Sequence, residues 1–363
     1  MERILHFTPG FRLGGIETLL LGLYQHIDRD RLQFDFVTDN TDPMDDFAQI
    51  RSMGGRVHQL GRYLDNPFAY QKKFNKIIWE MNPKKTIFHS HDALRSGPLL
   101  LACMRRGIKH RILHSHTESF EGSKRKHIAK PILFLTNQLA TQFLACSTQS
   151  GRFMFPGRKF SVFNNAIDLK RFAFDAAARA ALRLELGISA NTIVIGHTGR
   201  FTFQKNHSWI IKVFADFVKQ HLDSQLLLVG EGPLENEMRR LASACGVSDK
   251  VIFAGRQNQI GAYLSAMDLF FLPSHFEGLT ISLIEAQANG LPTLASDVVN
   301  DEVCLTQAIK KLTLNAPTSE WANALSTLLV QGRFNSVQQV YQLRAQGFDI
   351  STQWKQLVKF YEI

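Results

Sequence analysis

Residues 193–207 read IVIGHTGRFTFQKNH, an aliphatic run that passes through a glycine turn into a segment with a helical pattern. The aliphatic run, residues 193–199, is typical of a buried strand, and residues 206–220 have the apolar spacing of an amphipathic helix. A strand, a glycine loop and a helix in this order form half of a parallel βαβ unit. The stretch therefore predicts a parallel α/β fold.

The same alternation of strand and helix patterns recurs along the whole chain. Strands are also predicted at residues 4–7, 33–38, 86–91, 111–116, 143–147, 226–230, 251–255, 269–272 and 293–295. Two such series predict two Rossmann-like domains in tandem, an N-terminal domain in residues 1–170 and a C-terminal domain in residues 171–363. The pattern of the last predicted helix, residues 352–362, fits against either domain.

The carboxyl ends of the strands are the expected location of the chemistry. Open parallel sheets bind ligands at that edge, and two sheets that face each other would create one deep interdomain cleft. We therefore expect an α/β protein with two facing Rossmann-like domains and with its functional residues in the loops that follow the strands.

Composition restricts the class of protein further. Of the 363 residues, 45% are hydrophobic and 20% are charged, which suits two globular domains. The four cysteines are isolated in the sequence, so they indicate neither a disulfide framework nor a zinc site. The N-terminus lacks the apolar run of a secretion signal, and the longest apolar stretch, residues 131–146, is interrupted by polar residues. We expect a cytoplasmic protein, either soluble or peripheral to the membrane.

The excess positive charge lies in the first half of the chain. Residues 1–170 contain 25 Lys and Arg against 15 Asp and Glu, whereas residues 171–363 contain 17 of each kind. An anionic membrane surface or an anionic lipid-linked substrate would suit the first half, because each basic residue near such a surface adds about 1 kcal/mol of attraction. A solvated basic face without a partner is the alternative. We expect no nucleic-acid partner.

Two cations follow the strand at residues 193–199. Arg200 and Lys205 lie five positions apart in a loop that opens with Gly199 and ends at Asn206, where the helical pattern begins. Glycine lets a backbone approach a phosphate, arginine can bind it through two nitrogens, and lysine supplies a point charge for a departing diphosphate. An ordinary surface loop with two cations is the alternative interpretation.

A second loop and helix start lie at residues 273–286, PSHFEGLTISLIEA. A helix that begins near Thr280 would direct its free amides at a diphosphate. Glu277 and Glu285 are eight positions apart, about 12 Å along a helix, so they could contact opposite ends of one extended ligand. Glu285 could accept hydrogen bonds from both ribose hydroxyls. Both could instead be helix-surface glutamates, but Glu285 lies among apolar residues, where a carboxylate needs a partner.

Two glycine loops carry weaker signals. Gly230, Glu231 and Gly232 end a predicted strand in the second half, and this G-x-G without a third glycine could be a plain turn. Gly14 and Gly15 open a predicted helix near the N-terminus, where a phosphate or sugar could approach closely.

Histidines alternate at two predicted strand ends of the first half, as His89 and His91 and as His114 and His116. Alternating histidines can bind a metal ion, but no set of carboxylates or cysteines accompanies them at metal-ligand spacing. We therefore expect no metal ion and favour structural or substrate-contact roles.

These features together resemble the retaining GT-B glycosyltransferases of family 4 (group 1), in particular the bacterial capsular and exopolysaccharide branch that includes EpsF-like enzymes. The resemblance covers nearly the whole chain, and the two glutamates with the Arg and Lys at their spacing are its most specific part. The stretches that carry it are GGIE (14–17), RILHSHT (111–117), ACS (145–147), NAID (165–168), GRFTFQKNH (199–207), VGEGP (229–233), PSHFEGLTISLIEAQ (273–287) and GLP (290–292).

The resemblance also implies roles for residues. It places Arg200 and Lys205 at the donor diphosphate, Glu277 at the transferred sugar and Glu285 at the ribose. His116 corresponds best to the active-site histidine, with His114 as the alternative. The candidate catalytic residues are therefore His116, Arg200, Lys205 and Glu277, and the candidate donor-binding residues are Gly14, Gly15, Gly199, Asn206, Gly230, Glu231, Gly232, Arg256, Gly278, Leu279, Thr280 and Glu285. Family members retain the anomeric configuration and need neither a metal ion nor another cofactor.

The implied function is transfer of a hexose-type sugar from a nucleoside diphosphate, with UDP favoured, to a polyprenyl-diphosphate-linked saccharide. The reaction would take place at the inner face of the cell membrane, in synthesis of capsule, exopolysaccharide or lipopolysaccharide O-antigen. One alternative is a GT-B UDP-sugar epimerase, which would release UDP without an acceptor. Another is a non-catalytic nucleotide-sugar-binding partner in polysaccharide assembly, which would bind donor without turnover.

Overall fold

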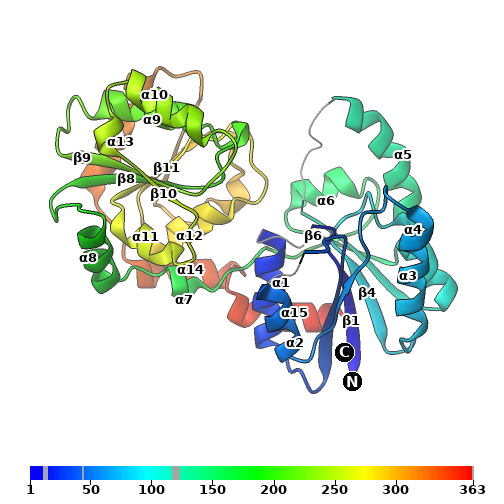
Figure 1. Ribbon diagram of the computed structural model, residues 1–363. Coiled ribbons are helices and arrows are strands. Elements are labelled where there is room, and N and C mark those ends of the chain that lie inside the picture. The colour runs from blue at the N-terminus through cyan, green and yellow to red at the C-terminus, as the bar shows by residue number, and fades with distance from the viewer. Residues whose placement is uncertain (11–14, 43–44, 117–122, 362–363) are drawn as a thin grey trace. The chain divides into compact units, whose positions relative to one another are not determined.

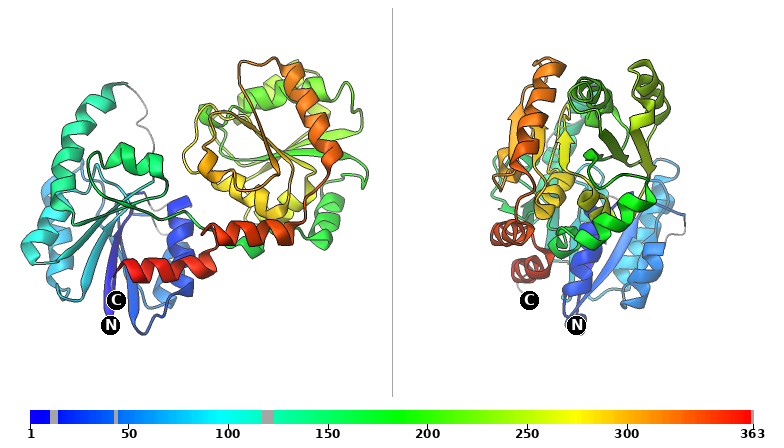
Figure 2. Two further views of the ribbon diagram at one scale, coloured as in Figure 1. Left: turned by 180° about the vertical axis from the view of Figure 1, so that it is seen from behind. Right: turned by 90° about the vertical axis from the view of Figure 1, so that its left-hand side faces the viewer.

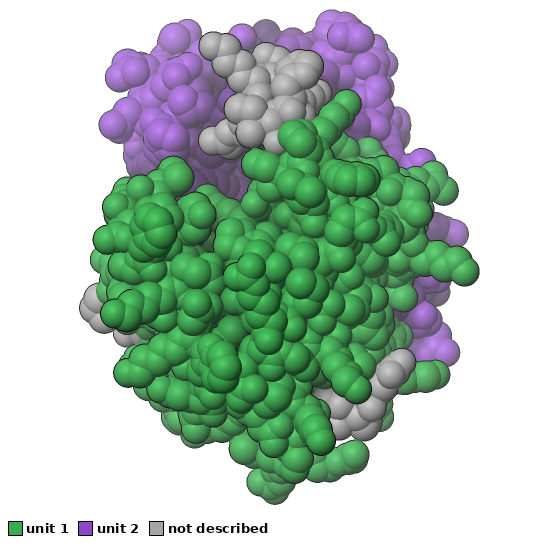
Figure 3. All heavy atoms as spheres, turned by 90° about the vertical axis from the view of Figure 1, so that its right-hand side faces the viewer, with its two compact units in different colours: residues 1–166, 350–363 green, residues 167–349 purple. Residues whose placement is uncertain are grey.

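The computed structural model describes residues 1–10, 15–42, 45–116 and 123–361 (Figure 1). These residues form two compact units, which Figure 3 distinguishes by colour. Unit 1 comprises residues 1–166 and 350–363, and unit 2 comprises residues 167–349. Each unit has its own parallel sheet covered by helices, so the predicted α/β class with two Rossmann-like domains is confirmed.

Unit 1 is built on a parallel sheet with the strand order β3-β2-β1-β4-β5-β6-β7, seven strands within the described residues. The strands are β1 (Glu2–Phe7), β2 (Leu32–Thr38), β3 (Val57–Gln59), β4 (Thr86–Ser90), β5 (His110–Ser115), β6 (Gln142–Ala145) and β7 (Ser161–Val162). Every residue of β2 is buried, because helices cover both faces of the sheet.

The helices of unit 1 form two layers, which Figures 1 and 2 show on either side of the sheet. One layer consists of α1 (Gly15–His26), α2 (Asp45–Ser52) and α15 (Ile350–Phe360), and the other of α3 (Pro67–Trp79), α4 (Gly97–Arg106) and α5 (Ser123–Leu139). The short helix α6 (Thr148–Met154) follows β6. Each layer packs its own apolar cluster against the sheet.

The C-terminal helix α15 belongs to unit 1, which is one of the two positions that its sequence pattern left open. Ile350 and Leu357 pack into the same apolar cluster as α1, and a Cβ on Gly22 of α1 would lie 2.4 Å from Cδ1 of Ile350. Glycine at this position therefore lets the two helices approach closely. The division between the units lies at residues 166 and 167 rather than 170 and 171.

Unit 2 is built on a second parallel sheet with the strand order β10-β9-β8-β11-β12-β13, six strands in the part that the structure describes. The strands are β8 (Ile193–Thr198), β9 (Ser224–Val229), β10 (Val251–Gly255), β11 (Leu269–Leu272), β12 (Thr293–Ser296) and β13 (Ile309–Leu312). One face is covered by α9 (His207–Phe217), α10 (Glu235–Ala244) and α13 (Thr318–Gln331), and the other by α7 (Leu169–Phe172), α8 (Ala176–Glu185), α11 (Ile260–Ala266), α12 (Ile281–Asn289) and α14 (Ser336–Ala345). Short 3₁₀ turns occupy Phe203–Lys205, Ser248–Lys250 and Asp301–Val303.

Candidate functional site

The two predicted phosphate loops of unit 2 follow neighbouring strands. The first loop, residues 199–206, follows β8, and the second, residues 273–280, follows β11. β8 pairs with β11, and the strand order reverses between them, because β9 lies beyond β8 whereas β12 lies beyond β11. Ligands bind at such switch points in open parallel sheets. The structure therefore brings both loops to the edge where a ligand is expected.

Hydrogen bonds join the two loops. The amide of His275 donates to the carbonyl of Gln204 at 2.8 Å, and Nδ2 of Asn206 donates to the carbonyl of Pro273 at 3.0 Å. Asn206 has a φ of 54°, a left-handed conformation that asparagine adopts more readily than most residues. These bonds fix one loop against the other.

Lys205 and Glu277 form an ion pair between the loops. Nζ of Lys205 lies 2.7 Å from Oε1 of Glu277, and Oγ of Ser274 donates to the same oxygen at 2.5 Å. The side chain of Glu277 is only 4% exposed, so its charge requires a cation and hydrogen-bond donors. An ammonium group has three donors, so Lys205 can hold Glu277 and still donate to a phosphate oxygen.

Arg200 is the second residue of the first loop and is exposed. Within the described chain it makes no side-chain hydrogen bond or ion pair. The side chain therefore keeps all its donors for a ligand, and a guanidinium can bind one phosphate through two of them.

Glu285 lies in α12 and is partly buried. No described residue forms a hydrogen bond or ion pair with its carboxylate. Burial raises the pKa of Glu285 to about 7, although the charges of Lys205 and Arg171 act to lower it. An unpartnered carboxylate at this edge of the sheet suits hydroxyl groups of a ligand.

Helix α12 begins between Glu277 and Glu285 in the sequence. Thr280 is its N-cap residue, yet the Thr280 side chain accepts no capping hydrogen bond from the described first turn. The amides at a helix N-terminus have no partner within the helix, and they carry a partial positive charge. With Gly278 and Leu279 preceding it, this helix start could bind an anion through backbone amides.

The glycine turn after β9 supports the first loop through close backbone contact. Gly230 has a φ of 142°, and a Cβ there would lie 2.1 Å from the carbonyl oxygen of Gly199. A Cβ on Gly232 would lie 2.6 Å from the carbonyl oxygen of Phe201, whose amide donates to the carbonyl of Glu231 at 3.0 Å. These glycines therefore allow the backbone of the first loop to pack against the turn.

Arg256 directly follows β10, two strands away from β8. Its guanidinium lies 3.9 Å from Oε1 of Glu231, and both side chains are at least half exposed. An ion pair with this degree of exposure contributes little to the stability of the fold. Both side chains can therefore turn toward a ligand at little cost.

Two histidines lie buried beneath the first loop. Nδ1 of His197 lies 2.8 Å from the carbonyl oxygen of Phe271, and the ring of His207 stacks on Phe201 with centroids 4.0 Å apart. Burial lowers the pKa of His207 to about 3 and the pKa of His197 well below its usual range, with the charge of Lys205 acting in the same direction. Both rings are therefore neutral in the folded protein.

The lowered pKa values of His197 and His207 predict that acid destabilises the fold. Their folded pKa values lie below the unfolded value of about 6.5, so the unfolded chain binds more protons and stability falls as the pH drops below 6.5. Each of the two histidines should lower the free energy of unfolding by about 2 kcal/mol at pH 5. In urea unfolding of the full chain, we expect His207→Gln to lose about 2 kcal/mol less than wild type between pH 8 and pH 5. Equal losses in both proteins would contradict this assignment.

The structure places His116 and its alternative His114 in a histidine cluster at the carboxyl ends of β1, β4 and β5. His116 follows β5, and its two ring nitrogens lie 3.0 Å from Nδ1 of His91 and 3.2 Å from Oδ1 of Asn165. His6 of β1 also belongs to the cluster, although the sequence patterns did not indicate it. Gly15 begins α1, and Gly14 lies outside the described residues.

His6 could have been found from strand pairing. β1 and β4 are neighbours in the sheet, and His6 is in register with His89. Both strands were predicted, but their adjacency was not, since sequence order does not give strand order.

Comparison with known proteins identifies the family. Residues 13–171 match the model of Glycosyltransferase Family 4, and residues 179–332 match that of Glycosyl transferases group 1. The glycosyltransferase EpsF of Bacillus subtilis is 33% identical over 344 residues, which cover 92% of this chain and 89% of EpsF. The chain belongs to the group 1 glycosyltransferases of family 4. It is therefore an enzyme of the EpsF-like kind, as the resemblance implied.

More distant relatives of this glycosyltransferase include enzymes with named substrates. The UDP-Gal:α-D-GlcNAc-diphosphoundecaprenol α-1,3-galactosyltransferase of Escherichia coli is 24% identical, with 81% of this chain and 79% of that enzyme covered. Among solved structures, Anabaena HepE in complex with UDP has a TM-score of 0.80 at 18% identity, with both chains fully covered. Sucrose-phosphate synthase of Thermosynechococcus elongatus has a TM-score of 0.77 at 19% identity, covering 100% of this chain and 98% of that one. The fold is thus GT-B.

Proposed function

We propose that this glycosyltransferase transfers a hexose-type sugar from a UDP-sugar to a polyprenyl-diphosphate-linked saccharide, with retention of configuration, in the synthesis of a surface polysaccharide. The observation that carries the proposal is the Lys205–Glu277 ion pair beside an unpartnered Glu285, at the switch point of unit 2. The relatives support its two ends: HepE binds UDP and UDP-glucose in solved structures, and the E. coli enzyme is named for a diphosphoundecaprenol acceptor.

Each residue of the site has a role in this reaction. Arg200, Lys205 and the amides at the start of α12 bind the diphosphate, and Glu285 accepts hydrogen bonds from the ribose hydroxyls. Glu277 orients Lys205 and contacts the transferred sugar. Because these groups supply the positive charge that a departing diphosphate needs, transfer requires no added metal ion or other cofactor.

The transfer step exchanges one bond at the anomeric carbon. The bond from that carbon to the diphosphate oxygen breaks, and a bond to the acceptor hydroxyl oxygen forms on the same face of the sugar. The acceptor proton passes to the leaving diphosphate. Lys205 and Arg200 stabilise the charge that develops on the diphosphate as the bond breaks.

The outer layer of unit 1 is the proposed membrane surface. We name the exposed face of α3, α4 and α5 the α3–α5 surface; these helices lie on the side of unit 1 that Figure 3 turns toward the reader. Its exposed apolar residues are Phe68, Trp79, Met104, Ile132, Phe134 and Leu135, and its exposed basic residues are Lys72, Lys73, Lys76, Arg105 and Lys130. Aromatic and basic side chains together suit an anionic lipid surface. Among the described residues no helix is long and apolar enough to cross a membrane.

The role of Glu285 predicts that donor binding depends on pH. An ionised carboxylate can accept hydrogen bonds from both ribose hydroxyls, whereas the protonated acid accepts more weakly and turns one oxygen into a donor. The pKa of Glu285, about 7, means that its ionisation rises between pH 6 and pH 8. UDP-sugars contain no phosphate monoester, so their own charge is constant over this range. We expect UDP-sugar affinity to increase about tenfold from pH 6 to pH 8 in wild type, and to be independent of pH in Glu285→Gln. A wild-type affinity that falls with pH would contradict this role.

Transfer itself can be tested with defined substrates. Purified enzyme would be incubated with UDP-hexoses and a polyprenyl-diphosphate-linked saccharide, and the product analysed by mass spectrometry and by NMR of the anomeric proton. The proposal predicts a glycosylated lipid with the donor's configuration. Release of UDP and an altered sugar without acceptor would instead indicate an epimerase, and donor binding without turnover would indicate a non-catalytic partner.

A further inference from the structure

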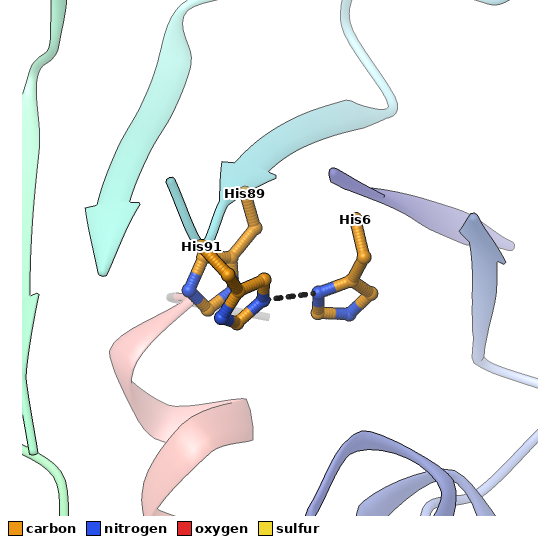
Figure 4. A group of neighbouring side chains, drawn as sticks. All are labelled: His6, His89 and His91. Carbon is orange, nitrogen blue, oxygen red and sulfur yellow. Dashed lines mark hydrogen bonds between the residues drawn. The ribbon is translucent and has the colours of Figure 1, made fainter. Parts of the chain in front are cut away.

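The histidine cluster of unit 1 is built from three adjacent strands. His6 comes from β1, His89 from β4, His91 from the loop after β4, and His114 and His116 from the end of β5. Three of them, His6, His89 and His91, are at most 6% exposed, and each offers a ring nitrogen within 4.8 Å of the other two. Figure 4 shows these three imidazoles gathered at the ends of the two strands.

Hydrogen bonds within the cluster leave several nitrogens unused. Nδ1 of His6 lies 3.1 Å from Nε2 of His91, and Nδ1 of His89 lies 2.7 Å from the hydroxyl of Tyr361. Nε2 of His6 and Nε2 of His89 are buried and have no hydrogen-bond partner among the described residues. Buried polar atoms without a partner are costly and rare in native structures, so Nε2 of His89, the atom that this ring would offer to a ligand, requires an explanation.

We propose that His6, His89 and His91 bind a divalent transition-metal ion of the zinc class through three imidazole nitrogens, with water in the fourth position. Three histidines and an open position form a familiar tetrahedral zinc environment. Nitrogens bound to one tetrahedral ion lie about 3.3 Å apart, given metal–nitrogen distances of about 2.0 to 2.1 Å. Nδ1 of His6 and Nε2 of His91 lie 3.1 Å apart, which already approaches that spacing. The ligand nitrogen of His89 lies within 4.8 Å of the other two, so His89 completes the site after a shift of the order of 1 Å.

Neighbouring groups can orient the proposed ligands. Metal-binding histidines commonly hydrogen-bond through their second nitrogen to a protein group that fixes the ring. Tyr361 provides this partner for His89, and His116 provides it for His91, with Asn165 in turn bonded to His116. His116 thus lies in the outer shell, because both of its nitrogens are already engaged.

The proposed ion would connect β1 to β4 at the switch point of the first sheet, and through Tyr361 it would join the end of α15 to that sheet. The residues that the proposed function places at the diphosphate and the ribose belong to unit 2, whereas the proposed ion lies in unit 1.

Metal content of the intact chain tests the proposal. The protein would be produced without a polyhistidine tag, in medium supplemented with Zn²⁺ or Co²⁺, and measured by inductively coupled plasma mass spectrometry. We expect about one ion per chain, and visible absorption typical of tetrahedral Co²⁺ in the cobalt form. Wild-type protein without bound metal and without these bands would overturn the proposal, whatever the variants do.

Three variants locate the ligands. His6→Gln should lower the metal content at least tenfold, whereas His116→Gln and the control His110→Gln, which changes a histidine of β5 outside the cluster, should retain the ion. Circular dichroism would establish that each variant is folded. Loss of metal in His116→Gln with retention in His6→Gln would refute the assigned ligands.

Discussion

Replacing Lys205 by alanine is expected to slow sugar transfer by about 100- to 1000-fold, because it removes the charge that stabilises the departing diphosphate. The loss should appear mainly in kcat, since negative charge on the leaving oxygens is greater in the transition state than in the bound donor. Initial rates at varied UDP-sugar concentration would measure it.

Lys205→Ala also leaves Glu277 without its cation, so the stability of the variant must be measured alongside its rate. Thermal unfolding would show whether unit 2 stays folded at the assay temperature. Lys212→Ala is the matched control, because Lys212 is an exposed lysine of the adjacent helix α9. A folded Lys205→Ala enzyme with wild-type kcat would contradict the role given to this residue.

Replacing two exposed apolar residues of α5 by glutamate is expected to abolish membrane binding. Phe134 and Leu135 are 65% and 64% exposed, and insertion of such side chains into a membrane contributes about 1.5 to 3 kcal/mol each. The double variant Phe134→Glu/Leu135→Glu should therefore bind anionic vesicles about 100-fold more weakly or worse. Co-sedimentation at low salt would measure the difference, and wild-type protein should be released at high salt.

A second double variant separates the α3–α5 surface from a general effect of charge. Val330→Glu/Val337→Glu adds the same two charges to exposed positions of unit 2, where Val330 is 88% and Val337 is 76% exposed. It should bind vesicles nearly as well as wild type. Failure of wild-type protein to bind anionic vesicles at low salt would refute the membrane part of the proposal. It would not affect the assignment of the donor site.

Much of the fold was predictable because buried parallel strands leave a strong pattern. The apolar runs at residues 193–199 and 269–272 correspond to β8 and β11, and the glycines and cations after them were recognisable from local sequence alone. The three-residue strand β3 and the two-residue β7 were missed because such short strands have no periodicity.

Contacts between distant parts of the chain could not be predicted. Helix α15 shows an apolar stripe in the sequence, but its position against α1 depends on the close approach at Gly22. The pairing of Lys205 with Glu277 depends on the adjacency of β8 and β11, and the grouping of His6 with His89 on that of β1 and β4. Strand order is a property of the folded sheet, and periodicity does not encode it.

Calorimetric titration with UDP-, GDP- and ADP-sugars, without added metal, tests the central claim most directly. Wild type would be compared with Glu285→Ala and Lys205→Ala, each shown to be folded. The account predicts that wild type binds a UDP-sugar in preference to the others, that Glu285→Ala loses this binding, and that Lys205→Ala, whose main effect is on kcat, binds the donor more weakly. Folded wild-type protein that binds no nucleotide sugar, or variants that bind as tightly as wild type, would contradict the assignment of the donor site to the two loops of unit 2.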